Sequence, residues 1–136
     1  MHNCLKTAVP GLLSLLIGAV LYILFRPASY VALLFGNVGW VSQLQDLLRP
    51  VGCDFLRFYF PDFLWAFALS CGLQTVFMPQ KWGVAACGTA AFACGVIWEG
   101  LQKTGAVSGT GDWLDVLMYF LAGVASILIN IKETGK

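Results

Sequence analysis

Charged side chains are scarce along this chain. Asp, Glu, Lys and Arg make up 11% of its 136 residues and hydrophobic residues 59%, whereas a soluble domain carries about 25% charged residues. A soluble core of this size could not bury so much apolar surface, so the composition excludes an ordinary soluble domain and indicates a membrane protein. The formal net charge of +1 also argues against a nucleic-acid partner, which would require a basic patch.

The chain also has few residues that could build a metal site or a disulfide framework. Its one histidine, His2, has no partner residue nearby in the sequence. Its five cysteines form no C-x-x-C pair, and Cys71, Cys87 and Cys94 lie within apolar runs, where cysteine is a small hydrophobic residue. We therefore expect no structural zinc and no disulfide framework, and the sequence identifies no cofactor.

Long apolar runs are what this chain has in abundance. Four of them could cross a bilayer as helices, at about residues 8–25, 62–78, 82–102 and 112–130. A run as long as the first makes about 27 Å of helix, which is close to the hydrocarbon thickness of a membrane. The sequence therefore predicts an all-α integral membrane protein, a four-transmembrane-helix bundle that forms a single domain over residues 1–136.

The connection between the first two runs, about residues 28–60, is long and only moderately polar. One helical face within it collects Trp40, Val41, Leu44, Leu47 and Leu48. This pattern predicts an interfacial amphipathic helix between the first two membrane helices, ended by Pro50. Residues 30–35 are apolar but too short to span, and the aromatic density of residues 55–65 is typical of a belt at headgroup level.

Carboxylates stand at the ends of these apolar runs. Successive spans alternate in direction, so the starts of the second and fourth spans and the end of the third lie at the same membrane face. The polar residues that meet there are Asp62, Glu99, Gln102, Asp112 and Asp115. Ionisable residues within membrane segments are costly and mark functional sites, so we predict a carboxylate-lined site at this face.

The third and fourth runs carry matching faces beside this site. Small residues recur at every fourth position of the third run and lead to the carboxylate: Cys87, Ala91, Gly95 and Glu99. Such a stripe lets another helix approach closely, so Glu99 should face protein rather than lipid. Asp115 and Tyr119 lie on one face of the fourth run, and the short turn between the runs predicts antiparallel neighbours. We therefore expect Glu99 and Asp115 to approach each other.

Each acid also has a purely structural interpretation. Asp112 could cap the fourth helix, and Asp115 could interact with its macrodipole. Glu99 and Gln102 could mark the interfacial end of the third span. Asp62 follows Pro61 and could be an ordinary helix-start acid.

Three short motifs resemble a known family. They are PDFL at 61–64, EGLQ at 99–102 and DWLD at 112–115, with Tyr119 and Gly123 downstream. These motifs are similar to those of the VanZ-like family of small bacterial integral membrane proteins, over roughly spans two to four. The founding member is associated with teicoplanin resistance, so the resemblance implies a role in the cell envelope or in the response to glycopeptide antibiotics.

The chain departs from the pattern of that family at three places. Gly109 stands near the position of a usual basic residue, and Trp65 or Ala66 stands where a histidine often follows the first acid. Tyr119 occupies the place of a frequent asparagine. A mechanism that depends on those groups is therefore not expected here.

Three functional classes remain open. In the first, the site binds an envelope lipid or the positive groups of a glycopeptide, with Glu99 and Asp115 at the centre and Gln102 orienting Glu99. Asp62 and Asp112 would line its rim, and Tyr119 is a further candidate ligand-binding residue. The second class is an intramembrane enzyme acting on a lipid-linked substrate, with carboxylates that divide acid and base roles or hold Mg²⁺; the lack of a nucleophile motif weighs against it. The third is a small proton-coupled transporter, for which four spans would require a homo-oligomer.

Charge alone does not orient the chain, because the predicted topology places four of its eight Lys and Arg residues on each side. The long connection and its aromatic residues resemble an exterior cap. We therefore expect a multi-pass protein of a bacterial inner membrane with both termini cytoplasmic and the site facing outward. Asn130, at the opposite end of the fourth run, is interpreted as a helix-end residue outside the site.

Overall fold

The computed structural model describes residues 2–25, 39–48, 53–77 and 81–131, and every regular element within these ranges is a helix. In chain order they are α1 (His2–Phe25), α3 (Gly39–Leu48), the π-helical turn η1 (Phe55–Tyr59), α4 (Phe60–Phe77), α5 (Lys81–Lys103) and α6 (Trp113–Asn130). The all-α prediction is therefore confirmed over the described part of the chain.

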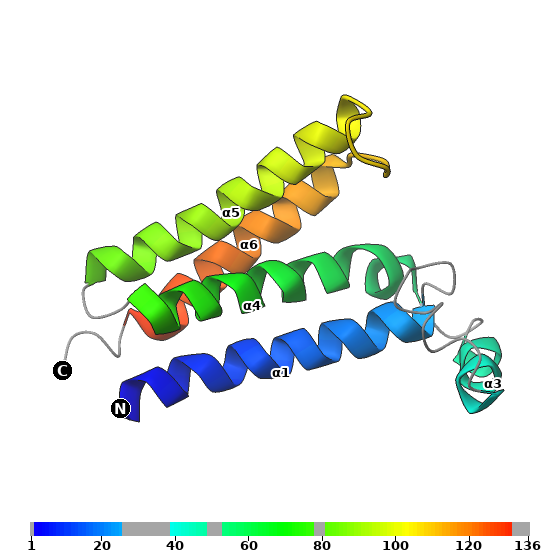
Figure 1. The fold of residues 1–136 in the computed structure, drawn as a ribbon, viewed down its shortest axis with the longest axis horizontal. Coiled ribbons are helices and arrows are strands. Elements are labelled where there is room, and N and C mark those ends of the chain that lie inside the picture. The colour runs from blue at the N-terminus through cyan, green and yellow to red at the C-terminus, as the bar shows by residue number, and fades with distance from the viewer. Residues whose placement is uncertain (1, 26–38, 49–52, 78–80, 132–136) are drawn as a thin grey trace.

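The long helices α1, α4, α5 and α6 form a bundle and alternate in direction (Figure 1). α4 contacts α1, α5 and α6, and α5 also packs against α6. The start of α1 and the end of α6 lie at one end of the bundle, whereas the start of α4, the end of α5 and the start of α6 point toward the other (Figure 1). α3 lies beyond the end of α1 and contacts it (Figure 1).

Three of the described helices are long and apolar enough to cross a membrane: Leu5–Phe25 of α1, Gly83–Lys103 of α5 and Trp113–Asn130 of α6. They indicate a multi-pass membrane protein. α4 has 18 residues, as α6 does, but its composition includes Asp62 and Gln74, which lower its hydropathy.

The distribution of side chains also suits a lipid environment. Leu16 of α1, Ile97 of α5 and Leu128 of α6 are exposed on the outside of the bundle. The interior holds polar groups instead, among them Gln74 of α4, whose exposure is 0%. Polar side chains inside and large apolar ones outside are the arrangement expected of helices in a bilayer.

The helix limits agree with the predicted runs to within two residues, except at the start of α1. This helix begins at His2, six residues earlier than predicted, because the polar residues before the apolar run still adopt helical geometry. α6 begins at Trp113 because Asp112 forms its N-cap.

The predicted amphipathic segment is helical in the structure. The Gln45 side-chain amide donates to the carbonyl of Ile23 (2.7 Å), one of the carbonyl groups left without a helical partner at the end of α1. Val41 is buried, whereas Trp40 and Leu47 remain exposed. The predicted apolar face is therefore only partly covered by protein. Pro50 and the apolar stretch 30–35 lie outside the described residues.

Candidate functional site

The turn between α5 and α6 places the main chain against the end of α5. A Cβ on Gly111 would lie 2.5 Å from Lys103 Cγ and 2.7 Å from the Glu99 carbonyl oxygen, so only glycine permits this close approach. The approach brings the amide of Asp112 to the Glu99 carboxylate, and Asp112 N–H donates to Glu99 Oε2 (2.9 Å). Glycine at this position therefore helps to position Glu99.

Asp112 is the N-cap of α6, as the structural interpretation of this residue predicts. Its backbone is extended (φ −119°, ψ 141°), and its Oδ1 accepts a hydrogen bond from Leu114 N–H (3.1 Å). Its second oxygen accepts from the hydroxyl of Tyr59 (3.2 Å). The cap thereby links η1 to the start of α6.

Glu99 is the most enclosed acid of the site, with 3% of its surface exposed. Its Oε1 accepts a hydrogen bond from the hydroxyl of Tyr119 (3.1 Å) and its Oε2 accepts from the Asp112 amide. The ring of Tyr119 lies directly against Gly95, one turn before Glu99 on α5, where a Cβ would overlap it. The small residues Cys87 and Ala91 are buried below it, so the predicted protein-facing stripe is confirmed.

Asp62 and Asp115 complete the group of acids around Tyr119. Asp115 precedes Tyr119 by one turn on the same face of α6, and Asp62 lies in the first turn of α4. The start of α4, the start of α6 and the end of α5, which carries Glu99, lie at the same end of the bundle (Figure 1). The structure thus brings together the acids of α4, α5 and α6 at one end of the bundle.

Gln102 has a different position from the one predicted. Its carboxamide is packed against Gly109, where a Cβ would lie 2.5 Å from Gln102 Cδ. Gly109 has a φ of +146°, a conformation that favours glycine. Gln102 therefore supports the turn, and Glu99 is oriented by Tyr119 and by the Asp112 amide.

Tyr59 contributes to this site, although the sequence analysis does not single it out. Burial raises the pKa of its hydroxyl, and the charge of the nearby Asp112 carboxylate and its hydrogen bond raise it further. The sequence shows only that residues 55–65 are rich in aromatic side chains, and it contains no signal that pairs Tyr59 with Asp112.

A second polar group lies toward the opposite end of the bundle. This buried amide network consists of Thr7, Ser70, Gln74, Ser126 and Asn130, all buried. Asn130 Nδ2 donates to Gln74 Oε1 (2.6 Å), and Thr7 Oγ1 donates to Asn130 Oδ1 (3.2 Å). The hydroxyls of Ser70 and Ser126 are hydrogen-bonded to each other (2.6 Å). Asn130 is thus the last residue of α6, as predicted, and also a bridge to α1 and α4.

The two polar groups have different chemical characters. Amides and hydroxyls in the buried amide network satisfy one another, which is the expected behaviour of a structural network within a membrane. In the Glu99 site, by contrast, the carboxylates of Glu99 and Asp112 accept hydrogen bonds from hydroxyl and backbone N–H donors. Among the described residues, no three His, Cys, Asp or Glu side chains are grouped closely enough to hold a metal ion.

Comparison with protein families, curated proteins and solved structures finds no match for this chain.

Proposed function

We propose that α4 is a fourth membrane span, so that the described helices form a four-transmembrane bundle with α3 at the membrane interface. α4 runs beside α1 and contacts α5 and α6 as well. Of the residues that lower its hydropathy, Gln74 is fully buried, and Asp62 is half-buried in the first turn of the helix. Its 18 residues provide about 27 Å of helix, enough to cross the hydrocarbon core.

The proposed orientation places both termini in the cytoplasm of a bacterial cell and the Glu99 site at the outer face of the inner membrane. An even number of spans puts the start of α1 and the end of α6 on one side. The exposed Trp40 and Leu47 of α3 suit the interface on the other side, where an amphipathic helix can bury an apolar face in lipid headgroups.

The function that this site supports best is recognition of a positively charged group on an envelope ligand. The observation that carries this proposal is the Glu99 carboxylate, which is 3% exposed and accepts hydrogen bonds from the neutral Tyr119 hydroxyl and Asp112 amide. Neutral donors orient a carboxylate without neutralising its charge. Asp62 and Asp115 lie in the first turns of α4 and α6 at the same end of the bundle, so a cationic group is the ligand that complements this group of acids.

The resemblance to the VanZ-like family supports the same proposal. Two of its motifs, EGLQ at 99–102 and DWLD at 112–115, contribute Glu99, the Asp112 cap and Asp115 to this site. A site of this chemistry in the envelope could recognise either the headgroup of an envelope lipid or the amines of a glycopeptide. We propose a role in envelope or glycopeptide response on this basis.

The decisive experiment measures teicoplanin susceptibility of a sensitive bacterium that expresses the chain. Glu99→Gln should abolish any protection, because it removes the charge and keeps the shape of the side chain. Asp112→Asn should retain most of it, since Asn caps a helix as well as Asp and the backbone amide that holds Glu99 is unchanged. Asp46→Asn, at an exposed position of α3, is the matched control for loss of an acid outside the site.

Membrane levels of each variant show whether the protein still inserts. Full protection by a normally inserted Glu99→Gln protein would refute the proposed site. Mg²⁺-dependent turnover of a lipid extract would instead identify an intramembrane enzyme, and uptake into vesicles driven by a pH step would identify a transporter.

A further inference from the structure

A short π-helical turn, η1, precedes α4 at the end of the bundle where the acids lie. It continues directly into α4, and the amide of Phe60 donates to the carbonyl of Phe55 across it. η1 contacts α1, α4 and α6, so it lies across this end of the bundle. π-helical turns are rare and are frequent at functional sites, which makes η1 a candidate functional element.

Aromatic side chains and a proline favour this wide turn. The rings of Phe55 and Phe60 are 6.2 Å apart, although residues five apart would lie about 140° apart around a regular α-helix. Pro61 follows directly and is fully buried. It supplies no N–H, and its ring would clash with the carbonyl of Arg57 in a regular α-helix. The chain before Pro61 is therefore joined to α4 with one backbone hydrogen bond fewer, as at a hinge.

Tyr59 fastens the end of η1 to α6. Its hydroxyl donates to Asp112 Oδ2 (3.2 Å), and the amide of Asp112 donates to Glu99 Oε2 (2.9 Å). Tyr59 thus binds the side chain of the same residue whose main chain holds Glu99. Tyr59 and Asp112 are half-buried, whereas Glu99 is almost fully buried, so the Tyr59–Asp112 hydrogen bond lies nearer the surface than Glu99.

The other surroundings of Glu99 are tightly packed. Gly111 approaches α5 so closely that a Cβ would lie 2.7 Å from the Glu99 carbonyl oxygen, and the ring of Tyr119 lies against Gly95. Tyr119 also belongs to the buried core between α4 and α6. A positive group can reach the enclosed Glu99 carboxylate only if a neighbouring element moves, and the chain before Pro61 is the element with a hinge.

We propose that residues 53–60 form a strap that moves about Pro61 and that the hydrogen bond from Tyr59 to Asp112 holds this strap closed over the Glu99 site. Opening of the strap admits a cationic group to Glu99. The proposal rests on the proposed binding of a cation at Glu99 and adds control of access to it. Movement of the strap is measurable without a ligand, so a strap that fails to move would leave the proposed binding at Glu99 standing.

Thiol labelling measures access to position 99. Glu99→Cys is made with and without Tyr59→Phe, and both proteins are treated with a quaternary-ammonium methanethiosulfonate, a small cationic reagent. Tyr59→Phe should speed labelling at position 99 by a factor of about 3 to 20, the range in which one interhelical hydrogen bond shifts an equilibrium in a membrane protein. Thr75→Val, which removes a hydroxyl that donates within α4, is the matched control and should leave the rate unchanged. Cys87, buried on the same helix, should remain slow to react.

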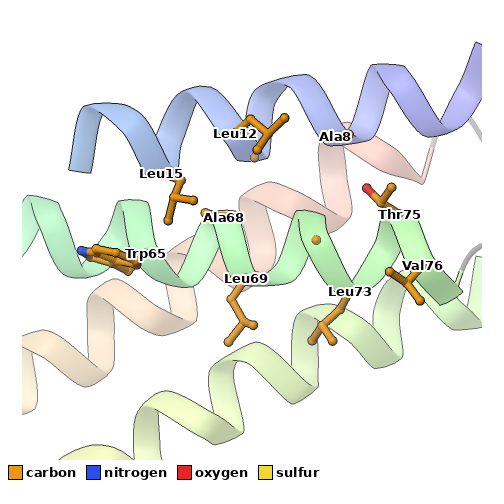
Figure 2. Close-up of a pocket in the computed structure, with 11 residues that line it drawn as sticks. Ala8, Leu12, Leu15, Trp65, Ala68, Leu69, Leu73, Thr75 and Val76 are labelled. Carbon is orange, nitrogen blue, oxygen red and sulfur yellow. The ribbon is translucent and has the colours of Figure 1, made fainter. Parts of the chain in front are cut away.

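Distances between spin labels test the hinge even if Glu99→Cys fails to insert. One label is placed on Leu117 of α6, and the other either on the native Cys53, before the hinge, or at Trp65, after it; all three positions are exposed. Trp65 lies beside an apolar groove between α1 and α4 (Figure 2), so a label there leaves the α4–α6 contact intact. With the remaining cysteines replaced by Ala, Tyr59→Phe should lengthen and broaden the distance from position 53 to 117 and leave that from 65 to 117 unchanged.

An unchanged labelling rate at position 99, or an unchanged distance from position 53 to 117, would overturn the proposal. Equal acceleration of labelling at position 99 and at Cys87 would also overturn it, as would equal lengthening of both distances. Either result would show that the whole bundle loosens, rather than that the strap moves about Pro61.

Discussion

Replacing Gly95 by Ala is expected to disrupt the α5–α6 interface and to displace Tyr119 from Glu99. The added methyl group would overlap the Tyr119 ring, which lies against Gly95. The ring belongs to a buried side chain that the new Cβ would overlap, so either the ring or the helix must move. Any such shift lengthens the hydrogen bond from the Tyr119 hydroxyl to Glu99 Oε1, which is now 3.1 Å.

Three contributions determine the size of this effect. Overpacking of a close interface costs about 1–3 kcal/mol. An interhelical hydrogen bond in a membrane protein contributes about 0.6 kcal/mol on average and up to about 1.7. Ala is a better helix former than Gly by about 1 kcal/mol, which acts in the opposite direction. The variant should therefore be about 1–3 kcal/mol less stable than the native chain.

Gly100→Ala is the matched control for this prediction. Gly100 lies on the same helix beside Glu99, and a Cβ there would meet no atom within 4 Å. It should gain helix propensity without a clash and be up to about 1 kcal/mol more stable. Unfolding of both variants in mixed micelles with increasing sodium dodecyl sulfate measures the difference. Equal shifts for the two glycines, or a larger loss of stability for Gly100→Ala than for Gly95→Ala, would refute the packing argument.

Three further predictions concern other parts of the chain. Asn130→Leu should destabilise the bundle by about 1–3 kcal/mol in the same unfolding assay, because Thr7 and Gln74 lose their partner. Thr75→Val, which removes a hydroxyl that donates to the Cys71 carbonyl in the same helix, should cost less. Folding raises the pKa of Tyr59 above its ordinary value of 10.0. Its stabilising contribution should therefore persist below pH 10 and be lost as the pH rises through the folded-state pKa, and the difference in tyrosinate absorbance between the native chain and Tyr59→Phe should have its midpoint above pH 10. Reporter fusions at residue 136 and within the α1–α4 connection should report opposite sides of the membrane, and reporters at the two termini should agree; opposite sides for the termini would exclude four spans.

The positions of the helices follow from the sequence because they depend on local properties. Apolar runs of membrane length predict α5 and α6 to within one residue at each end. The stripe of small residues before Glu99 predicts which face of α5 meets protein, since residues four apart share a helical face. The capping role of Asp112 is likewise local, because the acceptor and Leu114 N–H are two residues apart. The convergence of the acids at one end requires only the alternation of successive spans.

The partners of each polar group depend on contacts between residues that are distant in the sequence, and only the tertiary structure decides them. Tyr59 and Asp112 are 53 residues apart, and Thr7 and Asn130 are 123 apart. No periodicity in the sequence pairs them, because periodicity shows which face of a helix is buried and not which side chain lies opposite. Gln102 is a second example. It shares a helical face with Glu99, but its side chain packs against Gly109. The positive φ of Gly109 in the turn after α5, and not the periodicity of the helix, brings these two residues together.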